Sequence, residues 1–327
     1  MITWTEGYTA EYYGCYVDPV TGRDLNRFEI TGGEVTRMTD ELRVNASFEA
    51  TGFSGEHWIR LYMDARQSGS GAHIPLFTGL TATPQTKLIG TREKMTVACY
   101  SPLKVDSDIL LPRGWYAPTG IGADSIIKQL LEAPFGLSSE ELPALKEAII
   151  AEDGETRLSM TEKILAATGY SMEVTGTGAI RIFKTADDPV DRYGTTNDAI
   201  EPEVEVEEDY FAAPNVLLAI SDDLTAIARD EDPNSKFSIP TRGREIWIED
   251  TADLNDSETI AEYAQRRLKE EQNITKTITY SRRFNPAITP GSVIEMTYQP
   301  IRGKYRVIEQ TVKLTYNGRT EEKACEV

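Results

Sequence analysis

Four glutamates that alternate along one short stretch are the first residues whose types and spacing suggest chemistry. They are Glu201, Glu203, Glu205 and Glu207, and an apolar residue separates each from the next. In a strand, alternate residues share one face, so neighbouring carboxylates of this set lie roughly 6–7 Å apart. Inverting glycosidases use two carboxyl groups at a similar separation. Every alternating acidic strand gives this distance, however, so the spacing does not indicate a sugar-hydrolysing pair, and we predict no catalytic residue here.

The histidines and cysteines do not indicate a catalytic or metal site either. His57 stands beside Trp58, and His73 lies in a glycine-rich stretch, so each is expected to be a surface or packing residue. The cysteines are far apart and form no CxxC pair: Cys15, Cys99 and Cys325. So few imidazole and thiolate ligands make a zinc site unlikely to form. We therefore expect buried free thiols rather than a disulfide.

No motif of a known catalytic class is present. The sequence lacks a GxSxG elbow, an HExxH pair, a P-loop, and a GxGxxG run between a strand and a helix. The glycines at 176 and 178 fall in an expected hairpin, which offers no helix N-terminus to hold a phosphate. The acidic clusters at 222–223 and 230–232 do not have the ligand spacing of an EF-hand. The sequence thus predicts a protein that is not an enzyme and needs no cofactor or metal.

The composition is that of a globular, strongly acidic protein. The 327 residues include 53 acidic and 34 basic side chains, which gives a net charge of −19. This charge repels phosphate and disfavours sequence-specific binding of nucleic acid. The length allows two or three domains. No apolar run is long enough to span a bilayer, and the first six residues do not begin a Sec-type signal peptide, so we expect folding in a cytoplasm.

The elements expected between residues 26 and 100 are short strands. Apolar residues alternate with polar ones at 42–48, 59–63 and 95–99, the period of two that a half-buried strand requires. Glycines between these runs predict turns. This spacing favours a small barrel or sandwich.

The middle of the chain changes to helical patterns. We expect helices at 126–131, at 139–151 with Pro143 in its first turn, and at 159–168, the last beginning with a capping box at Ser159 and ending at Gly169. Two short strands at 170–174 and 179–183 follow. These helices and strands predict a compact insert in the middle of the chain.

The rest of the chain contains an unusually acidic segment and further strands. Residues 187–223 hold twelve acidic side chains and one base, Arg192. A buried strand is expected at 215–220 and a helix at 256–272, with an N-terminal cap at 256–258 and an apolar stripe through Ile260, Tyr263, Ala264 and Leu268. Strands are expected at 275–281, 293–298, 305–315 and 321–327. The run Tyr316-Asn317-Gly318-Arg319 predicts a type I′ hairpin turn.

The order of these segments resembles a known protein family. Residues 18–33, and the strand pair that ends at 47–48, resemble the opening strands of phage tail hub proteins. Residues 159–184, a helix with Leu-Ala-Ala-Thr-Gly-Tyr and then a Gly-Ala-Ile-Arg-Ile-Phe strand, look like the family's small central domain. The helix ending at 264–271, the strands at 277–280, 290–294 and 305–308, and the terminal hairpin are similar to XkdQ/YqbQ-type baseplate hubs of contractile tails, within the late-control gene D and secretion-spike base family. Residues 1–17 and 225–250 have no counterpart in this resemblance.

The resemblance implies a structural role in a virion or phage-like tail particle, assembled in the bacterial cytoplasm. The expected assembly is a homotrimer in which each subunit contributes two related β-barrels, so that six barrels match a hexameric tail tube while the threefold face seats a spike. The expected partners are therefore the tail tube protein, the spike protein and other baseplate proteins, with DNA or a tape protein only in transit.

The fold expected from this resemblance is mixed and β-dominated (α+β). It comprises a first barrel at 1–100, an α+β insert at 101–190, and a second barrel at 191–327 built from strands at about 200–220 and 273–327, with the helix 256–272 inserted.

The same resemblance suggests a role for the acidic stretch. Glu201, Glu203, Glu205 and Glu207 would line a lumen and repel passing DNA or tape protein, a hypothesis motivated by the twelve-to-one charge bias. Unchanged assembly and DNA ejection after replacement of all four by glutamine would contradict it. The alternative is that these side chains face solvent.

Two other function classes remain open on the sequence. One is a tail-tip receptor-binding or carbohydrate-binding module, which requires an exposed aromatic platform. The other is a wall-degrading hydrolase, which requires a cleft with two opposed carboxylates. The aromatic residues near the N-terminus could supply a platform, but we expect them to pack in a core or an interface: Trp4, Tyr8, Tyr12, Tyr13 and Tyr16.

Overall fold

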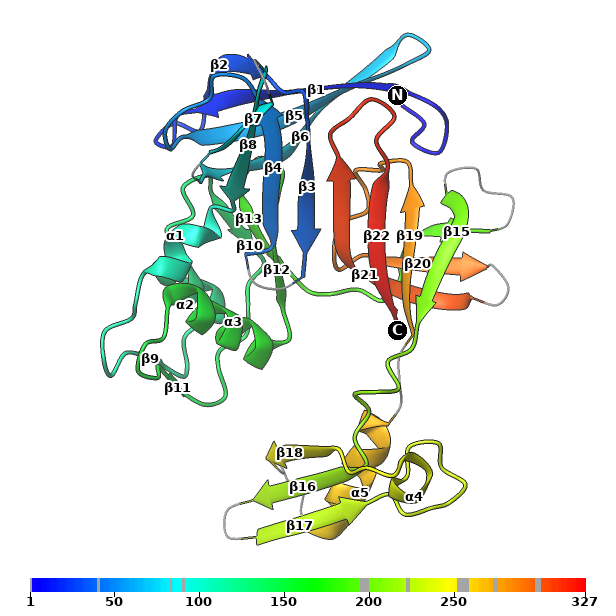
Figure 1. Cartoon of the computed structure of the whole chain (residues 1–327). Helices are drawn as coiled ribbons and strands as arrows, with labels where there is room; N and C mark the ends of the chain where they lie inside the picture. Colours follow the sequence, from blue (N-terminus) through cyan, green and yellow to red (C-terminus); the bar gives the residue numbers. More distant parts are fainter. Residues whose placement is uncertain are drawn as a thin grey trace. The chain divides into compact units, whose positions relative to one another are not determined.

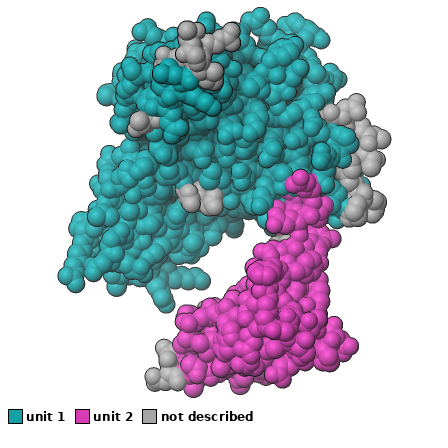
Figure 2. Space-filling model, viewed as in Figure 1, with its two compact units in different colours: residues 1–204, 279–325, 327 teal, residues 205–278, 326 magenta. Residues whose placement is uncertain are grey.

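The computed structural model consists of two compact units (Figures 1 and 2). Unit 1 comprises residues 1–204, 279–325 and 327, and unit 2 comprises residues 205–278 and 326. The structure describes residues 2–39, 42–82, 84–89, 92–194, 200–221, 224–251, 259–272, 276–297 and 301–327. The predicted ranges 1–100, 101–190 and 191–327 stay a prediction, because units defined by their contacts do not reveal which parts fold independently.

The first half of unit 1 is a set of antiparallel strands whose apolar residues alternate as predicted. Val44, Ala46 and Phe48 are buried on one face of their strand, and the runs at 59–63 and 95–99 also lie in strands with their apolar residues buried. The strands are β1 (Thr9–Val17), β2 (Asp24–Glu29), β3 (Gly32–Met38), β4 (Val44–Ala50), β5 (Trp58–Gln67), β6 (Ser70–Thr81), β7 (Gln85–Ile89) and β8 (Arg92–Tyr100).

Strands from the C-terminal part of the chain join the same sheet. The order is β15-β19-β22-β21-β3-β4-β8-β6-β5-β1-β2, with β7, β14 and β20 paired off this path. The joint is the antiparallel pair β21–β3, in which Thr311 lies opposite Thr36. The C-terminal strands are β14 (Pro189–Tyr193), β15 (Ile200–Glu207), β19 (Thr277–Arg282), β20 (Val293–Thr297), β21 (Arg302–Lys313) and β22 (Thr320–Glu326).

The β-dominated α+β class is confirmed, whereas two separate closed barrels are not found in the described part of the chain. There, the strand order runs from β15 to β2 without closing on itself. The reason is the β21–β3 pairing, which satisfies the backbone groups of one strand from each half and so merges the two halves into one sheet.

The terminal hairpin is confirmed, but its turn is not type I′. That turn requires positive φ at both central residues, and only Asn317 has one, with φ of 61°. The turn is instead closed by hydrogen bonds from the Gly318 amide to the Thr315 carbonyl and from the Lys313 amide to the Arg319 carbonyl. It is therefore longer than the two-residue loop that the Asn-Gly pair predicted.

Three helices and several short strands form the insert between β8 and β14 (Figure 1). Helix α3 packs against α1 and α2. Strands β12 and β13 of the insert pair antiparallel, as predicted. The elements are α1 (Leu103–Asp108), β9 (Tyr116–Ala117), α2 (Ala123–Leu130), β10 (Leu137–Ser139), β11 (Ile149–Ile150), α3 (Arg157–Thr168), β12 (Ser171–Val174) and β13 (Ile180–Phe183).

Of the predicted helices in this insert, the first and third are confirmed and the second is wrong. Helix α3 ends at Gly169 in the left-handed conformation as expected, but its capping box is formed by Thr156 and Ser159, so it begins earlier. The stretch 139–151 contains no helix. Pro143 restricts the residue before it to extended conformations, and the chain there bridges Gly122 through Ala144 and pairs as β11 with β9.

Unit 2 has its own small sheet and core. Strand β16 (Val216–Ser221) lies between β17 (Leu224–Arg229) and β18 (Trp247–Thr251), and the other elements are α4 (Ile239–Arg242) and α5 (Ile260–Glu271). Helix α5 packs on β16 and β17, and its apolar stripe buries Tyr263, Ala264 and Leu268 as predicted. Its N-cap is Thr259, and the cap predicted at 256–258 lies outside the described residues.

The expectation that residues 200–220 share one barrel with 273–327 is corrected by this sheet. Only β15 joins the C-terminal strands, whereas β16 pairs with β17 and β18. The reason is the apolar character of β16: Val216, Leu217 and Ala219 are all buried, which a central strand covered by a helix satisfies.

Candidate functional site

The acidic strand predicted from the sequence is β15, which ends the strand order of the large sheet. Glu203, Glu205 and Glu207 are exposed, whereas Glu201 is half-buried and forms an ion pair with Arg319 at 2.8 Å. Val206, between two of these glutamates, is also exposed (46%), so the apolar face of the strand is only partly covered. Carboxylates are thus displayed along a sheet edge, and their role as a lumen lining stays a prediction.

The histidines and thiols pack as expected. His73 lies 2.6 Å from Asp64 through Nδ1, and its ring stacks on Tyr62 with a centroid distance of 4.4 Å. Cys15 and Cys99 are buried free thiols, and burial raises the pKa of both. A raised pKa keeps each thiol protonated and unreactive at neutral pH. Cys325 is half-buried.

The N-terminal aromatic residues do not form a single exposed platform. Four of them pack partly buried against the main core: Trp4, Tyr8, Tyr12 and Tyr16. Tyr13 lies on the other face of β1, buried and stacked on Tyr62 at a centroid distance of 5.4 Å. Core packing, as expected, accounts for these residues.

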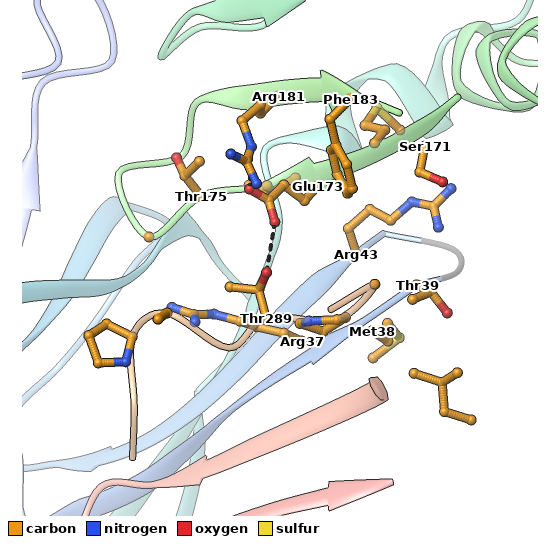
Figure 3. Close-up of a pocket in the computed structure, with 18 of the residues that line it drawn as sticks. Arg37, Met38, Thr39, Arg43, Ser171, Glu173, Thr175, Arg181, Phe183 and Thr289 are labelled. Carbon is orange, nitrogen blue, oxygen red and sulfur yellow. Dashed lines mark hydrogen bonds and ion pairs between the residues drawn. The ribbon is translucent and has the colours of Figure 1, made fainter. Parts of the chain in front are cut away.

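Unit 1 also contains a cavity of about 630 Å³ that no pattern in the sequence predicted (Figure 3). Its walls come from segments far apart in the chain: the end of β3 with Thr39 and Arg43, the middle of β6, the β12–β13 hairpin, the loop between β19 and β20, and β21. Glu173 of β12 forms an ion pair with Arg181 of β13 at 2.7 Å and accepts a hydrogen bond from Thr289 at 3.2 Å. This hydrogen bond joins the hairpin to the β19–β20 loop across one wall.

Two glycines explain why the β12–β13 hairpin sits where it does. A Cβ on Gly176 would lie 1.8 Å from the Pro75 carbonyl oxygen, and Gly178 has a φ of 84°. The close approach allows the Thr78 hydroxyl to donate to the Gly176 carbonyl at 2.8 Å. The glycines thus serve tight docking of the hairpin onto β6, and so they shape the cavity.

Arg37, which lines the cavity, belongs to a buried chain of polar side chains. Arg282 and Glu322 form an ion pair with almost no solvent exposure, and Tyr280 donates a hydrogen bond to the same carboxylate. Gln310 donates to Glu322 at 2.7 Å and accepts from Arg37 at 3.3 Å. The chain therefore connects strands β19, β21 and β22 to β3.

The charges in this chain stabilise each other. Burial alone would lower the pKa of Arg282, but the neighbouring Glu322 carboxylate raises that pKa above its usual value. Burial, reinforced by Glu322, raises the pKa of Tyr280 well above its usual value. Arg282 is therefore charged and the Tyr280 phenol neutral at neutral pH, which suits a structural contact.

Sequence reasoning missed these residues, although a signal was present. Arg37 follows Val35 by two positions, and Arg282 follows Tyr280 by two, so each charged residue occupies an inward position of an alternating strand. Glu322 stands likewise between the buried residues Thr320 and Ala324. A charge at an inward position predicts a buried polar partner, but not which partner.

The described residues hold no group of three or more His, Cys, Asp and Glu side chains arranged to bind a metal ion. Among the helices seen in the described ranges, none combines the length and apolar character needed to cross a membrane.

Comparison with known proteins gives a likeness in structure only. No protein-family model and no curated protein sequence matches the chain. A tail protein from Neisseria meningitidis MC58 matches with a TM-score of 0.66 and 15% identity, over 98% of this chain and 97% of that one. The 43 kDa tail protein of prophage MuSo2 from Shewanella oneidensis matches with a TM-score of 0.66 and 12% identity, over 97% and 98%. The prophage tail protein gp18 from Listeria monocytogenes EGD-e gives 0.53 and 14%, over 96% and 94%. The chain therefore has the fold of solved prophage tail proteins, over nearly its whole length.

Proposed function

We propose that this protein is a structural, non-enzymatic component of a phage-type tail, located in the baseplate. The observation that carries the proposal is the end-to-end match in fold to tail proteins, which spans 97% or more of both chains in two cases. A match over whole chains means that the additions and losses that usually accompany a change of role are small. Fold alone does not determine function, so the proposal depends on the assembly test below.

Within the baseplate, we assign the protein to the hub, as a homotrimer between the hexameric tail tube and the trimeric spike. The two strand groups of the large sheet, β1–β8 and the C-terminal strands joined to them through β21–β3, support this assignment. Three copies would present six such groups to the tube and a threefold face to the spike.

The edges of the sheet provide surfaces for this assembly. Strand β2 ends the strand order, and five of its six residues are exposed. Strand β15 ends the other side, and five of its eight residues are exposed. An open edge pairs readily with another chain, and charged side chains on both edges limit this pairing to a partner with complementary charge. These edges are where we expect neighbouring subunits or baseplate proteins to bind.

The proposal is tested by the molar mass of the purified protein, measured by light scattering, with negative-stain images of the same peak. A mass of three times 36.4 kDa with ring-shaped particles is expected. A compact dimer without a central opening would contradict the hub assignment. A monomer that also fails to trimerise when the tube and spike proteins are added would contradict it too.

A further inference from the structure

The cavity beside β3 contains an imbalance of charge. Among the residues that the structure describes, four arginines and one carboxylate line it: Arg37, Arg43, Arg181 and Arg306, with Glu173. This excess of positive charge stands out in a protein with a net charge of −19. Such a local reversal of sign concentrates anions at that point of the surface.

Three of the four arginines have an acidic partner. Arg43 pairs with Glu162 at 3.0 Å and Arg181 with Glu173 at 2.7 Å. Arg306 pairs with Asp187. These pairs neutralise most of the positive charge of the walls, so a polyanion would find little to bind.

Arg37 is the exception. It is only 8% exposed, and within the described part of the chain no carboxylate oxygen lies within ion-pair distance of it. Among the described residues, its guanidinium donates to neutral groups, the Gln310 amide oxygen at 3.3 Å and the Leu76 carbonyl at 2.9 Å. The Nε–H is buried and has no hydrogen-bond acceptor.

An uncompensated buried guanidinium destabilises the protein that contains it. Removing its hydration is costly, and neutral acceptors recover only part of the loss. Consistent with this, burial lowers the pKa of Arg37 to about 10, an effect that the more distant Glu173 opposes. A single negative charge placed beside the guanidinium would reduce this penalty.

The remaining surface of the cavity favours a ligand whose other part is apolar. Apolar side chains from four segments form much of the lining: Met38, Met172, Phe183, Phe284 and Ile308. Met172 and Phe284 are almost completely buried. A volume of about 630 Å³ lies inside the range of about 300–1,000 Å³ that small-molecule sites occupy.

We propose that this cavity binds a monocarboxylate with an apolar body, its carboxylate paired with Arg37 and its body against the methionine and phenylalanine side chains. Both the C-terminal residue of a peptide and a free organic acid have this chemistry. A carboxylate matches the planar guanidinium and can accept from two of its N–H groups together. The inference goes beyond the structural role proposed above and does not depend on it.

Binding to the full-length protein is measured by isothermal titration calorimetry with three probes. These are N-acetyl-Leu-Phe with a free carboxylate, the same dipeptide as its amide, and decanoate. The free acid should bind about 10- to 100-fold more tightly than the amide, since a charge-assisted hydrogen bond is lost. Tighter binding of the dipeptide acid than of decanoate identifies a peptide terminus as the source, and the reverse identifies a free organic acid. Equal affinity for acid and amide, or no binding of either acid at 1 mM, would overturn the proposal.

Substitution separates the cavity from the rest of the surface. Arg37→Met should weaken the binding of the dipeptide acid by the same 10- to 100-fold factor. It should leave the weak binding of the amide unchanged. The matched control is Arg302→Met, because Arg302 is exposed and remote from the cavity lining, and it should bind like the unmodified protein. Equal losses in both variants would overturn the assignment to Arg37.

A measurement on the unmodified protein covers the case in which Arg37→Met does not fold. Crystals grown with N-acetyl-Leu-(4-bromo-Phe) should show an anomalous bromine peak among the apolar side chains, with the carboxylate beside Arg37. A bromine peak at any other position would overturn the proposal.

Discussion

At the scale of single residues, the contacts of the buried pair Arg282–Glu322 make it a determinant of stability. Glu322 accepts hydrogen bonds from Tyr280, Arg282 and Gln310 while it has no solvent exposure. A buried pair adds little over well-packed apolar residues, but removal of one partner leaves an uncompensated charge. The stability of this region should therefore be far more sensitive to loss of one charge than to replacement of both.

The substitution Glu322→Gln keeps the size of the side chain and removes its charge. We expect it to lower the free energy of unfolding by about 3 kcal/mol, because Arg282 is left buried without a counter-ion. Chemical denaturation followed by circular dichroism measures the change. Glu321→Gln on the same strand is the control, since Glu321 is exposed and should change stability by less than about 0.5 kcal/mol. Equal effects of the two substitutions would contradict the argument.

At the scale of elements, the N-terminus of α3 depends on a carboxylate that lies just before the helix. Glu155 is 8% exposed, accepts from the Glu152 amide at 3.0 Å and the Ser159 hydroxyl at 3.1 Å, and forms an ion pair with Lys163 at 2.9 Å. Burial opposes ionisation, but these hydrogen bonds and Lys163 outweigh it and lower the pKa of Glu155. The lowered pKa means that the folded state favours the ionised carboxylate.

The sign of the pH dependence follows from that lowered pKa. The stabilisation is fully present above the pKa of the unfolded chain, near 4.5, and it is lost as the pH falls through the lower pKa of the folded state. Glu155→Gln should thus be about 1–2 kcal/mol less stable than the unmodified protein at pH 7, and this difference should shrink below pH 4. Denaturation curves at both pH values measure it. Glu147→Gln, at an exposed position, should show no such difference, and a gap that widens on acidification would contradict the argument.

The elements also show how far the sequence alone could lead. Strands such as β4 and helices such as α5 were predictable because alternation and a helical apolar stripe are local signals. The false helix at 139–151 had helix-forming residues but also Pro143, and its true partners, Ala117 and Gly122, lie in other segments. The sheet to which β16 belongs was not predictable, since periodicity identifies a buried strand without identifying its neighbours.

The cavity was less predictable from the sequence than the strands and helices. Arg37 and Gln310 are 273 positions apart, and they meet only because β3 and β21 pair. Their inward positions could have been read from alternation, but the pairing of strands that joins them depends on the whole sheet. The segments that surround Arg37 similarly come from four parts of the chain.

At the scale of the whole molecule, unit 2 is an insertion into unit 1 with its own hydrophobic core. That core consists of residues found only in unit 2: Leu217, Ala219, Ala228, Tyr263, Ala264 and Leu268. The ends of the insertion are close together, because Glu208 forms an ion pair with Lys276 at 3.6 Å. In unit 1, by contrast, the strands and the insert share one continuous core. The two units should therefore differ in how far each depends on the rest of the chain.

Replacing residues 209–275 by a short Gly-Ser linker tests this difference. We expect unit 1 to keep its near-ultraviolet circular dichroism and a cooperative unfolding transition, since no residue of its main core is removed. The matched control is a deletion of equal length, residues 118–184, which removes Ile127, Leu165 and other members of that core and should abolish cooperative unfolding. If removal of 209–275 abolished it as well, the two units would have to share stabilising contacts. Retention would show that unit 1 keeps its sheet without unit 2.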